Sequence, residues 1–356
     1  MQASHLNALT GMRFIAALLV LASHLWPARL GTITDPFYRS GFIGVSFFFV
    51  LSGFILGYSH LHAKKHIELR KFYWARFSRI YPVYLLGALL ILILDLQKFP
   101  VRAAVEFAAS LTLLQAWFGE YALVGNGVGW SLSVEAFFYA VFPFLAKLVA
   151  PLNTRSVLLV LGYCWIAALI PQLAAVYFEV PNVNRGLGGF FKFFPLFHLP
   201  EFIAGLLLAR LKELHPPTFK KDFTYDLLLL VSLFGIWLLT MSPMKMPWPL
   251  TFTGGAVMLF CTMIYLLSVD RGVCARFLGS KSLVSLGTAS YAMYILHPGL
   301  HELTHHLFPP RSAHFLTLEI VVVSLAVHKH IEVPSRLLLL QLRRPTSSIA
   351  NVTAIK

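Results

Sequence analysis

The sequence predicts an all-α polytopic membrane protein, with about ten transmembrane helices around a central polar cavity. Composition is the first observation: 58% of the 356 residues are apolar and 12% are charged, whereas about a quarter of a soluble domain is charged. Mean hydropathy is +0.72. The second observation is length, because a helix needs roughly 20 apolar residues to cross a bilayer. The third is that ionisable residues recur inside the apolar runs, which predicts that they face a polar interior.

Ten apolar runs are long enough to cross the membrane. They cover residues 9–26, 41–58, 80–96, 130–150, 156–178, 193–211, 225–241, 251–269, 283–300 and 314–330. An eleventh run at residues 103–117 is shorter and contains Glu106. We expect this eleventh run to form a re-entrant or interfacial helix.

The basic residues predict how these spans are oriented. The chain carries 29 Lys and Arg against 15 Asp and Glu, a formal net charge of +14, and basic residues gather in cytoplasmic loops. With ten spans and a cytoplasmic N-terminus, most of the Lys and Arg residues lie on the cytoplasmic side. If residues 103–117 also spanned, the basic segments 210–221 and 271–281 would lie outside. We therefore expect both termini to be cytoplasmic, and we assign the basic excess to orientation, with no nucleic-acid partner.

The first span contains two ionisable residues, Arg13 and His24. Eleven residues make about three helical turns, so both side chains share one face, about 16 Å apart along the axis. A cation at the cytoplasmic mouth and an imidazole deep in the same groove suit a long substrate with an anionic head and a reactive far end. Alternatively, Arg13 extends to the lipid headgroups and His24 is a hydrogen-bonded packing residue.

Arg76 and Arg79 precede the third apolar run. Three residues apart on a helix, they point the same way and form a pair of guanidinium groups suited to phosphate. The alternative is a basic belt at the membrane surface that binds anionic lipid.

Glu135 lies about one and a half turns into its span. A carboxylate inside a membrane needs a partner, and His24, expected in the same outer half, is the candidate. A structural hydrogen bond to a neighbouring helix is the alternative.

Taken in order, motifs along the chain resemble the acyltransferase 3 family. They span residues 9–334, and Ser46 stands where many relatives carry Asp. The motifs are Arg13-x10-His24, Gly44 to Phe54, Arg76-Phe-Ser-Arg79 followed by Pro82, Trp130-Ser-Leu to Glu135, Pro200-Glu-Phe to Gly205, Ser290 to His297-Pro298, and Glu332-x-Pro334.

This resemblance implies a membrane O-acyltransferase with ten spans, in a stand-alone form without the SGNH domain that many members carry. Residues 1–342 would be the acyltransferase 3 transmembrane domain, and residues 343–356 a polar cytoplasmic tail. Such enzymes transfer an acyl group, usually acetyl, from cytoplasmic acyl-CoA to a hydroxyl of a glycan or glycolipid. We expect an inner-membrane O-acetyltransferase acting on a surface polysaccharide such as lipopolysaccharide O-antigen or an exopolysaccharide. Its partners would be acyl-CoA inside, a glycan or lipid-linked glycan outside, and membrane lipid.

The resemblance also assigns roles to residues. Arg76 and Arg79 would hold the phosphates of acetyl-CoA, with help from Arg13. His24 would be the general base, since an imidazole can take a hydroxyl proton near neutral pH. We infer in addition that Glu135 orients His24, as the acid partner does in a hydrolase triad. The substrate-binding residues would be Trp130, Tyr294 and His297.

Two other functions stay open on the sequence alone. Intramembrane Arg, His and Glu also serve proton coupling, which is compatible with a proton-coupled transporter or flippase of a glycan precursor. His301, Glu302 and His305 fit the H-E-x-x-H pattern of a zinc protease, in which two histidines hold the metal. This segment runs into Pro309 and Pro310, which disfavour a long ligand-bearing helix, and we expect no metal.

Overall fold

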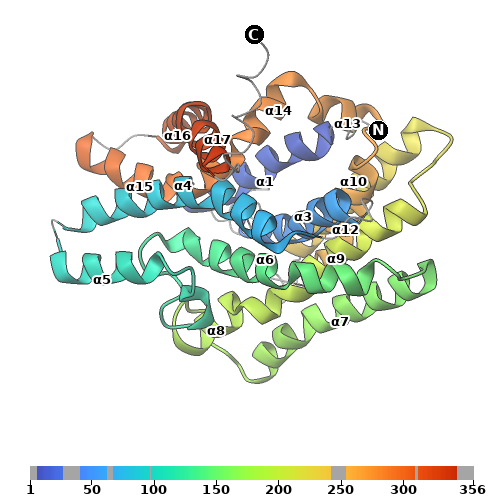
Figure 1. Cartoon of the computed structure of the whole chain (residues 1–356), viewed down its shortest axis with the longest axis horizontal. Coiled ribbons are helices and arrows are strands. Elements are labelled where there is room, and N and C mark those ends of the chain that lie inside the picture. Colours follow the sequence, from blue (N-terminus) through green and yellow to red (C-terminus); the bar gives the residue numbers. More distant parts are fainter. Residues whose placement is uncertain are drawn as a thin grey trace, which may run out of the picture.

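The computed structural model describes residues 6–26, 41–61, 67–96, 98–241, 254–308 and 312–342. These residues form helices and turns, with no strand among them, so the predicted all-α fold is confirmed (Figure 1). The predicted tail, residues 343–356, lies outside the described residues. The longer helices are α1 (Asn7–Leu25), α3 (Ile43–His60), α4 (Leu69–Leu96), α6 (Trp130–Val149), α7 (Thr154–Tyr177), α9 (Pro195–Leu214), α10 (Asp222–Met241), α15 (Ser290–Leu307) and α16 (Ala313–Val327).

Shorter helices connect them. They are α5 (Pro100–Ser110), α8 (Gly186–Phe193), α12 (Val257–Leu267), α13 (Val273–Leu278), α14 (Lys281–Thr288) and α17 (Val333–Gln341). Two 3-10 turns, η1 (Gln115–Trp117) and η2 (Gly127–Gly129), lead into α6. A π-helical segment, η3 (His328–Glu332), joins α16 to α17.

Seven segments of the described residues are long and apolar enough to cross a membrane. They are Asn7–Leu25, Ile43–His60, Leu69–Leu96, Gly127–Val149, Thr154–Tyr177, Gly186–Leu214 and Asp222–Thr240. The protein is therefore a polytopic membrane protein. Three predicted runs take another form: 251–269 contains only the 11-residue α12 among its described residues, 283–300 is divided between α14 and α15, and 314–330 continues through η3 into α17.

Run 283–300 packs closely on the first helix near the point where it is divided. A Cβ added at Gly287, near the end of α14, would lie 1.8 Å from the backbone oxygen of Thr10 on α1. The chain therefore passes directly against the first helix at this point. Hydropathy alone does not reveal such a contact.

Residues 103–117 are predicted to be re-entrant or interfacial. Residues 115–117 form η1, and residues 103–110 belong to α5, which begins at Pro100 and ends at Ser110. Its 11 residues span about 17 Å at 1.5 Å each, too short for a hydrocarbon layer of about 30 Å. Apolar side chains are exposed on it, including Val101 at 78%. This helix lies alongside the end of α4 (Figure 1).

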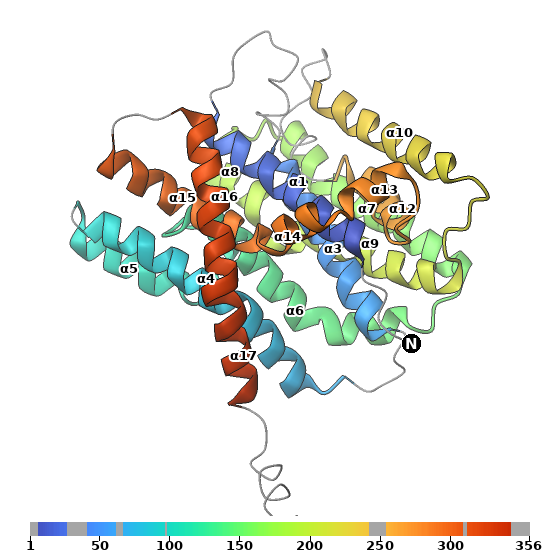
Figure 2. The same ribbon diagram turned by 90° about the horizontal axis from the view of Figure 1, so that it is seen from above.

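Close contacts between helices determine the positions of the helices that carry the candidate site. A Cβ at Gly53 on α3 would lie 1.9 Å from Phe202 O, and one at Gly205 on α9 would lie 1.9 Å from Val50 O. Such reciprocal small-residue contacts let membrane helices approach closely. On the other side of the bundle, α17 crosses α4 (Figure 2), where Trp74 Nε1 donates a 2.8 Å hydrogen bond to Leu339 O.

Candidate active site

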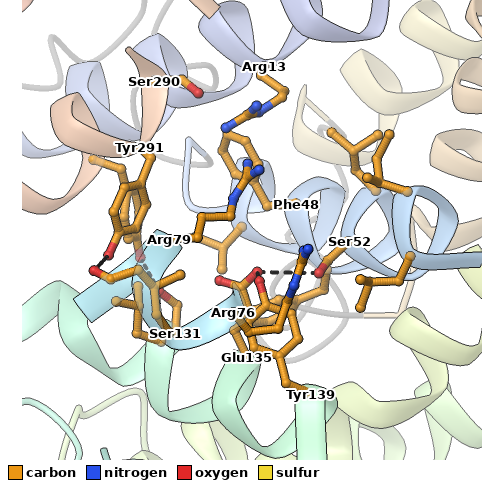
Figure 3. A pocket seen from close by; sticks show the side chains of 18 of the residues that line it. Arg13, Phe48, Ser52, Arg76, Arg79, Ser131, Glu135, Tyr139, Ser290 and Tyr291 are labelled. Carbon is orange, nitrogen blue, oxygen red and sulfur yellow. Dashed lines mark hydrogen bonds between the residues drawn. The ribbon is translucent and has the colours of Figure 1, made fainter. Parts of the chain in front are cut away.

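A cavity of about 300 Å³ lies between α1, α3, α4, α6 and α15. Five of the eight predicted site residues line it: Arg13, Arg76, Arg79, Glu135 and Tyr294. The remaining three predicted residues, His24, Trp130 and His297, do not line it. The three arginines face into this cavity (Figure 3), whose lining also includes apolar side chains such as Phe48 and Phe49.

Helix geometry explains the arginine cluster. Arg76 and Arg79 are three residues apart on α4, so they share a face, and α1 brings Arg13 to the same cavity. The Arg76 guanidinium lies 5.7 Å from the ring centre of Phe72 and 5.9 Å from that of Tyr139. Such cation–π contacts hold the group against the wall without neutralising its charge.

No carboxylate forms an ion pair with Arg13, Arg76 or Arg79 within the described part of the chain. The Nε atom of Arg76 is buried and has no hydrogen-bond partner there. Like charges inside a helical bundle repel each other and lose hydration. The arrangement is therefore suited to a ligand with several negative charges.

Glu135 is held by neutral donors. Its Oε1 accepts a short hydrogen bond from the Tyr139 hydroxyl, one turn further along α6, and a 3.3 Å hydrogen bond from Ser52 Oγ on α3. Figure 3 shows the carboxylate beside Arg76, in the cavity. Glu135 therefore offsets part of the arginine charge without pairing directly with it.

The predicted hydrogen bond between Glu135 and His24 is wrong. His24 lies in the last turn of α1, where its Nδ1 is 2.9 Å from Val20 O, while Ser52 and Tyr139, which donate to Glu135, line the arginine cavity. The sequence prediction placed both residues in the outer half of the membrane. In the structure, Glu135 lines the same cavity as the three arginines, and His24 does not line it.

His24 nevertheless has the chemistry of a base. A carbonyl oxygen only accepts hydrogen bonds, so Nδ1 carries the hydrogen in the bond to Val20, and the lone pair of the neutral ring is on Nε2. The ring lies 4.9 Å, centre to centre, from that of His297. His297 in turn lies 6.1 Å from the ring of Tyr294, at the edge of the cavity. His297 and His24 thus lie outside the cavity lining, and His24 is exposed while His297 is buried.

The two aromatic residues predicted to bind substrate differ in position. The Tyr294 hydroxyl lies 2.8 Å from Ser131 Oγ and donates to Val128 O at 3.2 Å, which holds the phenol in the cavity wall. Trp130 is 7% exposed and packs on Phe49 and His198. Phe49 lines the cavity, so Trp130 supports the wall from behind.

Sequence reasoning missed four residues near the arginines. Ser52 and Tyr139 hold Glu135, and Tyr291 lines the cavity while donating a 2.5 Å hydrogen bond to Ile80 O. Arg336 on α17 interacts electrostatically with Arg79, Arg76 and Glu332, and its buried Nε has no partner among the described residues. The four-residue spacing of Glu135 and Tyr139 puts both on one helix face, so the sequence could have predicted their contact.

The H-E-x-x-H segment lies elsewhere, in the C-terminal half of α15. Glu302 forms an ion pair with Lys98 at 2.8 Å, and the rings of His301 and His305 meet edge to face at 4.6 Å. Among the described residues, no group of three or more His, Cys, Asp or Glu could hold a metal ion.

Fold and cavity define a polytopic membrane protein with a cationic interior site. The profile of a family described as an acyltransferase domain, Acyl_transf_3, matches residues 6–327. The chain therefore belongs to the acyltransferase 3 family and is a membrane acyltransferase, which confirms the resemblance.

Known relatives agree with this class. Over 316 residues the chain is 28% identical to acyltransferase MdmB of Streptomyces mycarofaciens, covering 82% of this chain and 78% of MdmB. Over 323 residues it is 23% identical to O-acetyltransferase OatA of Staphylococcus aureus, covering 82% of this chain and 50% of OatA. The chain thus spans about half the length of OatA. No solved structure gives a significant match.

Proposed function

We propose that the protein is an O-acetyltransferase of the inner (cytoplasmic) membrane. It takes acetyl-CoA from the cytoplasm and transfers the acetyl group to a hydroxyl of a cell-surface polysaccharide such as lipopolysaccharide O-antigen or an exopolysaccharide. Family membership supports acyl transfer. The name of its relative OatA, an O-acetyltransferase, supports acetyl as the group and oxygen as the acceptor atom.

One observation carries the proposal: Arg13, Arg76 and Arg79 line a single interior cavity without a neutralising ion pair in the described residues. Coenzyme A carries its phosphates at one end and its thioester at the other. Guanidinium groups bind phosphate through two parallel hydrogen bonds. The unpartnered Arg76 Nε fits such a ligand.

The cavity is large enough for part of the donor. Its 300 Å³ lies at the lower end of small-molecule sites, so it accommodates the phosphates and the start of the pantetheine arm, while the adenosine stays at the cytoplasmic mouth. Arg336, on α17 beside this mouth, adds a fourth cation. Glu135 and Glu332 limit the positive charge, since both act electrostatically on Arg13.

His24 acts at the far end of the arm, about 16 Å from Arg13 along α1. Its Nε2 takes the proton of the acceptor hydroxyl while the hydroxyl oxygen attacks the thioester carbonyl. The C–S bond breaks, and the thiolate receives the proton from His24. In this proposal the arm passes Tyr294 in the cavity wall and reaches the two histidines, which do not line the cavity.

This topology puts both termini, including residues 343–356, in the cytoplasm. It also puts the arginines on the cytoplasmic side, where acetyl-CoA is available, and His24 on the glycan side. The basic loops support this orientation through the preference of Lys and Arg for the inside.

The test is acetyl-CoA turnover by the full chain reconstituted in lipid vesicles with isolated surface polysaccharide. Free thiol released from acetyl-CoA measures donor consumption, and ester groups on the polysaccharide measure transfer. We expect both for the unchanged protein, and both lowered by roughly 10²- to 10⁴-fold for His24→Ala. The matched control is Lys71→Ala, because this side chain is 74% exposed on the same helix as the arginines.

Two outcomes contradict the proposal. Transfer at an unchanged rate in His24→Ala removes His24 as the base. Movement of a glycan precursor across the vesicle without release of free thiol favours the transporter instead.

A further inference from the structure

A second imidazole lies against the proposed base. The ring centre of His297 on α15 is 4.9 Å from that of His24, with 46° between the planes. His297 is 1% exposed. The contact joins the middle of α15 to the last turn of α1.

Backbone hydrogen bonds determine the tautomer of both rings. His297 Nδ1 lies 2.8 Å from Tyr294 O, and His24 Nδ1 lies 2.9 Å from Val20 O. Because a carbonyl oxygen only accepts, both Nδ1 atoms carry hydrogen. Each neutral ring therefore has its lone pair on Nε2.

The Nε2 atom of His297 has no hydrogen-bond partner in the part of the chain that the structure describes, although it is buried. Buried polar atoms are nearly always bonded, so an exception requires an explanation. A neutral Nε2 can only accept. His24 contacts the His297 ring, and it gains a proton during the proposed reaction.

We propose that His297 is a positioning residue for His24, which shares the proton on His24 Nε2 through its own Nε2. With ring centres 4.9 Å apart, two imidazole nitrogens that point toward each other lie within hydrogen-bond distance. His297 thereby stabilises the charged form of His24, which is the role that the sequence predicted for Glu135. The inference rests on the proposed function.

The proton balance is simple. The acceptor O–H bond breaks as His24 takes its proton, an O–C bond forms and the thioester C–S bond breaks. While the proton is on His24, His297 holds it in place. The thiolate then takes the proton from His24, and His297 ends unchanged.

Three substitutions separate this role from a structural one. His297→Asn keeps a polar group near the position of Nδ1 and removes Nε2. His297→Gln places an amide oxygen near the position of Nε2, where it can accept. His297→Phe keeps the ring volume and removes both nitrogens, and His305→Phe is the control two turns further along the same helix.

We expect His297→Asn and His297→Phe to lower kcat for acetyl transfer roughly 10- to 100-fold, a part of the effect of a general base. Their KM for acetyl-CoA should stay unchanged, because the arginines bind the donor. His297→Gln should recover most of kcat. His305→Phe should match the unchanged protein.

Two results would overturn the inference. If His297→Asn and His297→Gln have the same kcat, the hydrogen bond of residue 297 to Tyr294 O matters for catalysis, and an acceptor at the position of Nε2 does not. If His297→Phe matches the unchanged protein while His24→Ala lowers kcat, the pairing fails and the proposed function stands. Absence of turnover in both the unchanged protein and His305→Phe overturns the proposed function and the pairing together.

Discussion

The substitution Arg79→Ala best distinguishes two roles of the arginine cluster, which are binding of the acyl donor and stabilisation of the fold. Within the described residues Arg79 makes no ion pair, and its positive charge acts on Arg13 and Arg76. Removing the Arg79 side chain therefore breaks no ion pair among the described residues. It also removes the repulsion between its charge and those of Arg13 and Arg76. We expect the free energy of unfolding to stay within about 0.5 kcal/mol of its original value, or to rise.

Binding of coenzyme A, in contrast, should become weaker in Arg79→Ala. A hydrogen bond to a charged group contributes about 1.5–3 kcal/mol, so losing the contact of Arg79 with phosphate should raise Kd roughly 10- to 150-fold. At a ligand concentration of 100 times the original Kd, binding stabilises the folded protein by about 2.7 kcal/mol. A Kd raised about 100-fold reduces this stabilisation to about 0.4 kcal/mol.

The assay is thermal unfolding of the purified protein in detergent, with and without coenzyme A. Arg79→Lys should give an intermediate shift, since it keeps the charge and loses the paired hydrogen bonds. Lys71→Ala should behave like the unchanged protein. An Arg79→Ala protein that keeps the full shift, or that is destabilised by more than about 2 kcal/mol without ligand, would refute the reasoning.

Four further substitutions test separate parts of the account. His24→Ala should lower kcat by roughly 10²- to 10⁴-fold and leave the thermal shift with coenzyme A unchanged. Tyr139→Phe removes a donor to Glu135, and we expect a several-fold change in KM for acetyl-CoA in steady-state assays, with kcat conserved. Arg336→Ala should raise the same KM without lowering kcat. Gly205→Ala puts a Cβ 1.9 Å from Val50 O and should destabilise the protein by about 1–3 kcal/mol in thermal unfolding.

Helical periodicity explains what the sequence could predict. The spacing of Arg76 and Arg79, and the apolar runs around them, depend on one helix at a time. The structure places these two arginines with Arg13, Glu135 and Tyr294 around one cavity. Most of the charged residues of this cavity could therefore be predicted from local pattern and motif order.

The missing parts depend on which helices face each other. Ser52 meets Glu135 because α3 packs beside α6, and no periodicity within one helix indicates that contact. His24 and His297 are far apart in sequence and meet where α1 crosses α15. Arg336 reaches the arginine cluster because η3 and α17 continue from α16 and pack on α4. Tertiary packing, and not propensity, decides these contacts.

We propose that the cavity lined by Arg13, Arg76 and Arg79 binds the phosphates of the acyl donor. A cryo-electron microscopy map of the protein in nanodiscs with coenzyme A tests it most directly. We predict phosphate density between these three guanidinium groups, with the thiol end directed toward Tyr294. Well-defined coenzyme A density at another surface, with the three arginines uncontacted, would contradict the account.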